Sequence, residues 1–119
     1  MTKKEIAEAF SNGNFELTYP YLSENVQWTV VGEDYFNGKK AVIDNCRQVA
    51  RYFNSVTTNF ITVNVIADNN RVAVSGTAEF IRDGKTVNFI SACDIYEFNC
   101  NNELTTITSY CIQKQMANQ

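Results

Sequence analysis

Residues 90–112, ISACDIYEFNCNNELTTITSYCI, decide the fold that the sequence predicts. Both halves of this stretch are rich in β-branched and aromatic residues, and the polar run at residues 99–102 between them is typical of a turn. The stretch therefore predicts two long antiparallel strands. Asp94 stands in the centre of the first strand among apolar neighbours, and a carboxylate in that position requires an explanation.

The same strand signals continue upstream as far as residue 58. Asp83-Gly84 is a strong hairpin signal, and polar turns separate the other segments. We predict four sequential antiparallel strands after residue 57, with no helix between residues 58 and 112. Their expected ranges are residues 58–67, 71–81, 85–98 and 103–112.

Two short helices are expected at the start of the chain. Thr2 and Glu5 have the spacing of a capping box, and Asn12-Gly13 ends the helix that they begin. The second helix starts near Asn14 and contains Pro20, which removes a backbone donor. We therefore expect this second helix to be short or bent.

A strand and the longest helix follow. Residues 26–31, VQWTVV, predict a strand, and Asn37-Gly38 marks a turn before a helix from Lys39 to about Ser55. Apolar residues recur along this helix at helical spacing: Val42, Cys46, Val49, Phe53 and Val56. The sequence thus predicts the α+β class, with a cone-shaped, strongly curved antiparallel sheet, three N-terminal helices on its concave side and a pocket at its mouth.

Composition limits the classes of protein to consider. The chain has 119 residues, 45% of them hydrophobic, so we expect one globular domain over residues 1–119. A net charge of −3 with no basic stripe argues against nucleic acid as a partner. The first ten residues lack the apolar run of a signal peptide, and no segment is apolar over the ~18 residues of a membrane span. We therefore expect a cytoplasmic protein with no membrane partner.

Histidine is absent, which excludes Ser-His and Cys-His nucleophiles and zinc sites that use histidine. The four cysteines form no C-x-x-C pair, and Cys46 is expected in the core. Glu33 and Asp34 are interpreted as a solvated loop rather than a metal site. We expect neither a metal nor a cofactor.

The order of elements and three short motifs resemble the nuclear transport factor 2-like superfamily. The motifs are V-x-W-x-V-x-G at residues 26–32, Asn37-Gly38 before the long helix, and D-x-Y-x-F at residues 94–98. The resemblance covers roughly residues 3–113 and is nearest to SnoaL-like polyketide cyclases and ketosteroid isomerase-like proteins. Members include isomerases, dehydratases, cyclases and plain binding or dimerisation domains, so the resemblance is more specific for fold than for function.

Asp94 matches the strand acid that points into the cone in these relatives. In ketosteroid isomerases an apolar pocket keeps this acid protonated, and in SnoaL-like cyclases it acts as general acid/base. The residues agree with this role, because a carboxylate flanked on its face by Ala92 and Tyr96 loses solvent, which raises its pKa. The resemblance implies that Asp94 is catalytic.

The chain departs from the isomerase pattern at two positions. Thr29 stands where the isomerase has its proton-shuttling aspartate, and Ile6 stands where it has its oxyanion tyrosine. Threonine is not a base near neutral pH, so steroid isomerisation by the known route is not expected. Thr29 either lines the pocket or is simply a β-branched strand residue.

The strand register decides where Asp94 points. If Asp83-Gly84 forms a strict two-residue turn, Asp94 lies opposite Ala73 on the more polar face of the sheet. A β-bulge in one strand would instead place Asp94 on the apolar face with Val74. Alternation alone does not favour the bulge, whereas the resemblance does.

We expect the pocket to enclose a small, mostly apolar molecule. Three functional classes stay open: an isomerase-, cyclase- or dehydratase-type enzyme that uses Asp94 as acid/base, a non-catalytic ligand-binding module, and a dimerisation domain. Phe89 and Ile90 lie on opposite faces of one strand, and one helical layer covers one face, so we expect a homodimer through the outer sheet face. The candidate ligand-binding residues are Tyr19, Trp28, Thr29, Gly76, Ala78, Ala92 and Ser109.

Overall fold

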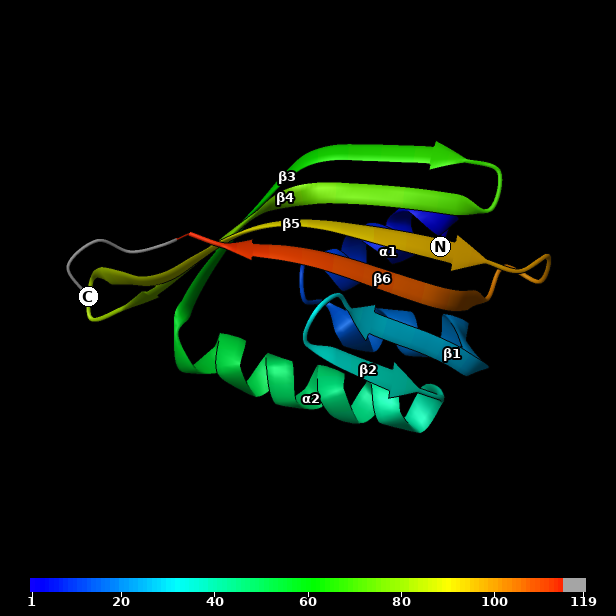
Figure 1. Cartoon of the computed structure of the whole chain (residues 1–119), viewed down its shortest axis with the longest axis horizontal. Coiled ribbons are helices and arrows are strands. Elements are labelled where there is room, and N and C mark those ends of the chain that lie inside the picture. The colour runs from blue at the N-terminus through cyan, green and yellow to red at the C-terminus, as the bar shows by residue number, and fades with distance from the viewer. Residues whose placement is uncertain (115–119) are drawn as a thin grey trace.

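The computed structural model describes residues 1–114 and has the predicted α+β order of elements (Figure 1). Three helical segments precede the long strands: α1 (Lys3–Ser11), the 3-10 helix η1 (Phe15–Tyr21) and α2 (Lys39–Ser55). Six strands form one sheet: β1 (Leu22–Val30), β2 (Asp34–Asn37), β3 (Thr57–Asp68), β4 (Arg71–Arg82), β5 (Lys85–Phe98) and β6 (Leu104–Gln113).

The strands lie in the order β2-β1-β6-β5-β4-β3. The four long strands β3 to β6 are antiparallel, and the structure has no helix between residues 58 and 112, as predicted. The pair of β1 and β6 is parallel, so the prediction of an antiparallel sheet is wrong at this one pair. Parallel pairing is possible there because α2 and four strands separate β1 from β6 in the chain.

The short strand β2 was not predicted. It pairs antiparallel with β1 and places Phe36 opposite Trp28. Four residues between two glycine turns carry too little alternation to predict a strand from sequence. As a consequence Asp34, which the sequence placed in a solvated loop, begins a strand at the edge of the sheet.

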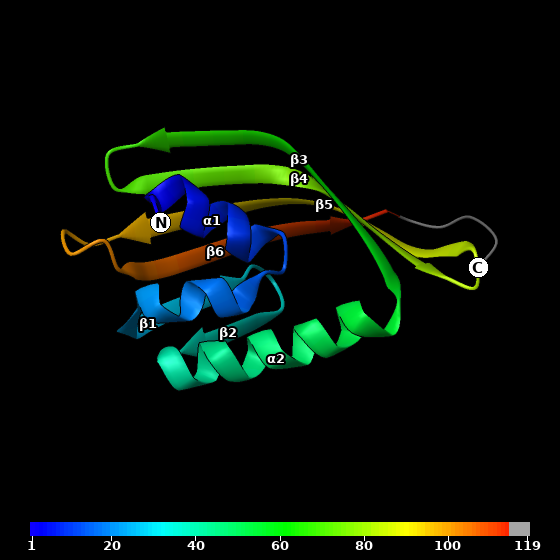
Figure 2. The ribbon, with the colours of Figure 1, turned by 180° about the vertical axis from the view of Figure 1, so that it is seen from behind.

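Two irregularities bend the long strands. The register between β3 and β4 shifts at Val63, and the register between β4 and β5 shifts at Val87. Such bulges increase the local twist and curvature. The sheet is therefore strongly curved without closing, and Figure 2 shows α1 lying across its concave side while α2 runs along its lower edge.

The helices begin and end where the sequence predicts. The Thr2 side chain accepts a hydrogen bond from the backbone N–H of Glu5, whose carboxylate accepts one from the Thr2 N–H, so the capping box is present. Pro20 lies inside η1, and this segment is a short 3-10 helix rather than an α-helix. In α2, Val42 and Cys46 are fully buried against the core.

The core lies between the concave face and the helices. Its largest fully buried side chains include Ile6 of α1, Tyr96 of β5 and Ile107 of β6. Among residues 1–114, none of the helices has the length and apolar character needed to cross a membrane.

Candidate functional site

The register of the hairpin between β4 and β5 places Asp94 on the concave face. Arg82 pairs with Lys85 across the Asp83-Gly84 turn, as in a strict hairpin. Val87 is then left out of the ladder, so from Phe80 onward every partner in β5 is displaced by one residue. Asp94 consequently lies opposite Val74, and the bulged register that the resemblance favoured is confirmed.

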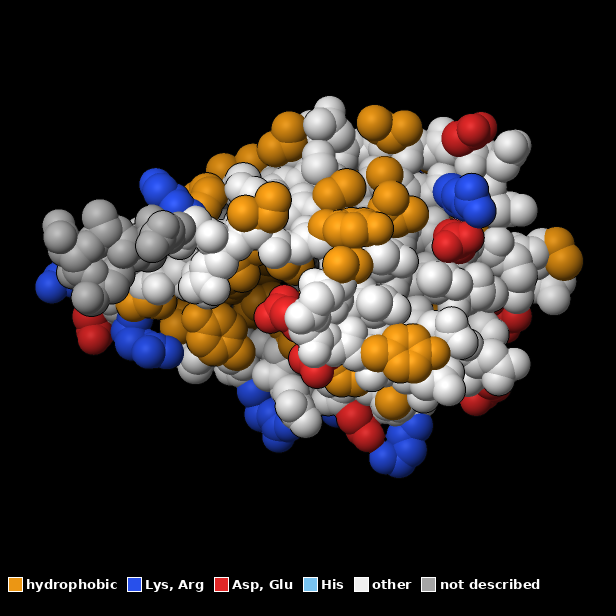
Figure 3. Space-filling view, viewed as in Figure 1, with side chains coloured by type: hydrophobic (Ala, Val, Ile, Leu, Met, Phe, Trp, Pro, Cys, Tyr) orange, Lys and Arg blue, Asp and Glu red, His pale blue; other side chains and the backbone are white. Residues whose placement is uncertain are grey.

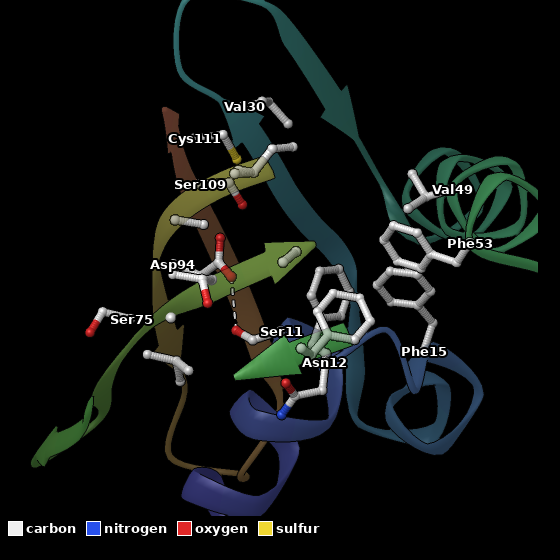
Figure 4. Close-up of a pocket in the computed structure, with 18 of the residues that line it drawn as sticks. Ser11, Asn12, Phe15, Val30, Val49, Phe53, Ser75, Asp94, Ser109 and Cys111 are labelled. Carbon is white, nitrogen blue, oxygen red and sulfur yellow. Dashed lines mark hydrogen bonds between the residues drawn. The ribbon is translucent and has the colours of Figure 1, made fainter. Parts of the chain in front are cut away.

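A cavity of about 360 Å³ lies between this face, the end of α1 and the side of α2. Figure 3 shows a hollow with apolar atoms inside it and acidic side chains at its edge. In Figure 4, Asp94 and Ser109 lie on one side of the cavity, and Phe15, Val49 and Phe53 lie on the other. The cavity is thus mainly apolar, with a carboxylate in its wall.

Asp94 is held by hydroxyl groups. The Ser11 Oγ donates a hydrogen bond of 2.8 Å to the Asp94 Oδ2, and the same Oγ lies 2.6 Å from the Tyr96 hydroxyl. Because Ser11 gives its proton to Asp94, the Tyr96 hydroxyl is the donor in the second bond. Ser11 is the last residue of α1, and Asp94 and Tyr96 belong to β5. The end of the helix therefore holds the Asp94 Oδ2, and Tyr96 holds the Ser11 hydroxyl in place.

Ser109 lies directly across from Asp94 in β6 and connects it to Trp28. The buried Trp28 Nε1–H donates a 3.0 Å hydrogen bond to the Ser109 Oγ. In this bond the Ser109 oxygen is the acceptor, so its hydroxyl proton can be donated to the Asp94 carboxylate. Trp28, Ser109 and Asp94 thus form one polar row across three strands.

Burial dominates the electrostatics of the site. Desolvation raises the pKa of the Asp94 carboxyl above its usual value, while the hydrogen bonds from Ser109, Ser11 and Tyr96 oppose this rise. Desolvation and the nearby Asp94 charge also raise the pKa of the Tyr96 hydroxyl well above its usual range. Burial raises the pKa of Cys111, another cavity residue, to about 11. Tyr96 and Cys111 are therefore protonated near neutral pH, and Asp94 is the group placed to exchange a proton.

The structure brings most of the predicted site residues to this cavity. Its wall contains Trp28, Gly76, Ala78, Ala92, Asp94 and Ser109. Gly76 pairs with Ala92, and Ala78 lies two positions further along β4 on the same face, so the small side chains cluster as expected. Whether these residues contact a ligand stays a prediction.

Two predicted residues lie elsewhere, which corrects the sequence-based expectation. Thr29 pairs with Tyr35 and Thr108 and follows Trp28 in β1, so the strand alternation directs it to the convex face. Tyr19 packs against the core from η1 and lines a separate surface hollow of about 520 Å³ between η1 and α2. A tyrosine in a proline-containing segment has no periodicity from which its direction could be predicted.

Several site residues were missed by sequence reasoning. Ser11 and Asn12 at the end of α1, Asp34 of β2 and Asn88 of β5 all line the cavity. Ser11 had a usable signal, because it follows the buried Ala7 by one helical turn. Asp34 and Asn88 had none, since their positions depend on the unpredicted strand β2 and on the bulge at Val87.

The described part of the chain, residues 1–114, contains no group of cysteine, aspartate and glutamate side chains arranged to hold a metal ion. Asp94 is surrounded by hydroxyl groups rather than by further carboxylates. The site as described can therefore do proton-transfer and hydrogen-bonding chemistry with its own side chains.

Comparison with known proteins gives one match to a family model and several to solved structures. The model of the SnoaL-like domain matches residues 4–105. A search of curated proteins gave no significant match. A crystal structure of an NTF2-like protein of unknown function from Cytophaga hutchinsonii is 34% identical to this chain, with a TM-score of 0.82 over 91% of this chain and 94% of that one.

Two more distant structures share the fold. An LEH-like epoxide hydrolase of Mycobacterium tuberculosis is 18% identical, with a TM-score of 0.69 over 92% of this chain and 82% of that one. A candidate isomerase of the SnoaL-like family from Agrobacterium tumefaciens is 14% identical, with a TM-score of 0.71 over 94% of this chain and 99% of that one.

Proposed function

Because the chain belongs to the SnoaL-like domain family, we propose that its cavity encloses a small, mostly apolar molecule and that Asp94 acts on that molecule as acid/base. The proposed reaction class is isomerase-, cyclase- or dehydratase-type chemistry on a carbon acid or an enol-forming substrate. One observation carries the proposal: a desolvated carboxyl with a raised pKa stands in the wall of an apolar cavity.

The hydrogen bonds around Asp94 support a role in proton transfer. Ser11 fixes Oδ2 from the helix side, which leaves the other oxygen of the carboxyl on the side of Ser109 and the cavity. A protonated carboxyl there can donate a hydrogen bond to a developing oxyanion. The ionised carboxyl can accept a proton from a carbon next to a carbonyl group.

The steroid isomerase route does not fit this chain. Thr29, at the position of the isomerase base, lies on the convex face. Ile6, at the position of the oxyanion tyrosine, is fully buried in the core. Any carbon-acid chemistry here would have to use Asp94 with its serine and tyrosine neighbours.

Proton exchange at carbon tests the proposal without knowledge of the natural substrate. Apolar cyclic ketones such as 2-indanone and 2-tetralone are incubated with the protein in D2O, and deuterium incorporation beside the carbonyl is followed by NMR. We expect the wild-type protein to accelerate the exchange and Asp94→Asn to abolish the acceleration. Thr29→Val is the matched control on the convex face and should leave the rate unchanged.

A non-catalytic ligand-binding domain is the second candidate. It is favoured by the partners of Asp94, which are hydroxyl groups and include no second base. If the ketones bind to both wild type and Asp94→Asn but neither protein accelerates exchange, the acid/base role is wrong and this second function holds.

A further inference from the structure

The charged groups of the cavity are all of one sign. Asp34 and Asp94 line it, and among residues 1–114 neither a lysine nor an arginine does. The ion pairs of the described chain are Lys39–Glu24, Lys40–Asp44 and Arg71–Glu97, and none of them involves either cavity aspartate. A ligand with a carboxylate or phosphate group would meet repulsion there and no partner.

Among residues 1–114, no lysine or arginine forms an ion pair with Asp94. The hydroxyls of Ser11, Ser109 and Tyr96 surround it, the thiol of Cys111 lines the same cavity, and Cys46 is buried in the core. All of these groups are neutral, since burial raises the pKa of Cys111 to about 11 and that of Cys46 to about 12. An unpaired buried charge is costly, so Asp94 must either keep its proton or receive a cation from outside.

Aromatic side chains form a large part of the cavity lining. Aromatic side chains of Phe15, Phe53 and Phe60 line the cavity, together with Trp28 on the sheet side. The Phe53 ring stacks on the rings of Phe15 and Phe80, so this wall is a continuous apolar surface suited to the hydrocarbon part of a ligand.

From this arrangement we infer that the cavity selects an apolar molecule that carries a basic nitrogen, with the protonated amine against Asp94, over one that carries a carboxylate or phosphate. This inference rests on the proposed function, because it names the ligand class of the same cavity. The amine would take the place of the counter-ion that the protein does not supply, and its apolar part would contact the aromatic wall.

A series of three ligands with one skeleton tests the inference by isothermal titration calorimetry at about pH 8, where an alkylamine with a pKa of about 10 is protonated. The ligands are 4-phenylbutylamine, 4-phenylbutan-1-ol and 4-phenylbutyrate. We expect the amine to bind about tenfold or more tighter than the carboxylate, with the alcohol between them, which corresponds to one or more pKa units of interaction with a nearby charge.

Two variants assign the selectivity to a residue. In Asp94→Asn, which keeps the shape and can still accept from Ser11, the advantage of the amine over the alcohol should disappear. Thr29→Val on the convex face should keep the wild-type order. Calorimetry in two buffers of different ionisation enthalpy should also show proton release when the amine binds near the pKa of Asp94, and none with the alcohol.

The outcomes separate this inference from the proposed function. If the alcohol and the carboxylate bind as tightly as the amine, the inference is wrong while the ligand cavity stands. The inference is also wrong if the advantage of the amine persists in Asp94→Asn. If none of the three ligands binds, both the inference and the enclosed-ligand function are contradicted.

Discussion

At Asp94, burial raises the pKa of the carboxyl group while hydrogen bonds lower it. Its pKa is raised in the folded protein, so the folded state holds the proton more tightly than the unfolded chain does. The free energy of unfolding therefore falls as pH rises from the unfolded pKa of about 4 through the higher folded pKa. Above that range Asp94 is ionised in the folded protein, and its buried charge lowers the free energy of unfolding.

Asp94→Asn should remove this cost, since the amide has the same shape and does not ionise. We expect the variant to gain stability relative to wild type as pH rises, with the smallest difference near pH 4. Urea unfolding of both proteins from about pH 4 to about pH 8 measures the difference. Parallel pH profiles for the two proteins would show that Asp94 titrates normally and is exposed to solvent.

Ser109 contributes through the hydrogen bond that it accepts from Trp28. Ser109→Ala leaves the buried indole N–H without a partner, so we expect a loss of roughly 1–3 kcal/mol in the free energy of unfolding. Ser91→Ala, at an exposed position of β5, is the control and should change stability by less than about 0.5 kcal/mol. Equal effects of the two changes in urea unfolding would contradict the role given to Ser109.

Individual site residues could be predicted from sequence only where periodicity gives a direction. Asp94 and Ser109 lie in long alternating strands, and both were identified. Thr29 lies in an alternating strand too. The resemblance matched it to the position of the isomerase base and made it a pocket candidate, while the alternation with Trp28 directs it outward. Helical spacing from Ala7 gives the direction of Ser11, whereas its partners Asp94 and Tyr96 lie more than eighty residues away and could not be identified from local sequence.

At the scale of elements, β4 lies between two bulged strands. Gly76 in β4 is opposite Thr62, beside the bulge at Val63 in β3. A Cβ built on Gly76 would lie 2.3 Å from the carbonyl oxygen of Ile61, so the two backbones approach as closely as they do because no side chain separates them.

Gly76→Ala should therefore force β3 and β4 apart. We expect a loss of roughly 1–3 kcal/mol or more, the usual cost of overpacking, because backbone atoms must move. Thr77→Ala, at the next position of β4, serves as the control with a small effect. Thermal unfolding of both variants measures the difference, and an unchanged melting temperature for Gly76→Ala would show that β3 can move away without cost.

The elements that sequence predicts well here are those with caps and long periodicity. The capping box of α1, the apolar stripe of α2 and the Asp83-Gly84 hairpin all appear where expected. The bulge at Val87 could not be derived from the hairpin signal, because the turn itself has the regular two-residue form and the shift comes three residues after it. The parallel pairing of β1 with β6 is a property of the assembled sheet and has no signature within β1.

At the scale of the whole molecule, the convex face of the sheet is apolar and uncovered. Figure 3 shows hydrophobic side chains gathered over the long strands on the side away from α1. Exposed apolar residues there include Ile61, Val63, Tyr110 and Ile112, the last with 72% of its surface accessible. We propose that this face pairs with a second copy of the chain, since monomers rarely expose an apolar patch of this kind.

Ile112→Asp should break such a homodimer by placing a charge in the proposed apolar interface. Light scattering at tens of micromolar protein, a concentration at which we expect wild type to be fully paired, should give a dimer mass for wild type and a monomer mass for the variant. Leu17→Asp, at a residue 57% exposed on η1, is the matched control and should stay dimeric. A monomer mass for wild type would contradict the proposal.

Trp28 gives the protein an optical property of its own. It is the one tryptophan of the chain, its ring lies in the wall of the cavity, and its N–H is bonded to the serine that faces Asp94. The tryptophan emission of the protein therefore comes from a single indole, and we expect its wavelength and intensity to change when the carboxyl next to Ser109 gains or loses its proton. We therefore expect the fluorescence of Trp28 to report both ligand binding in the cavity and protonation of Asp94, without any added label.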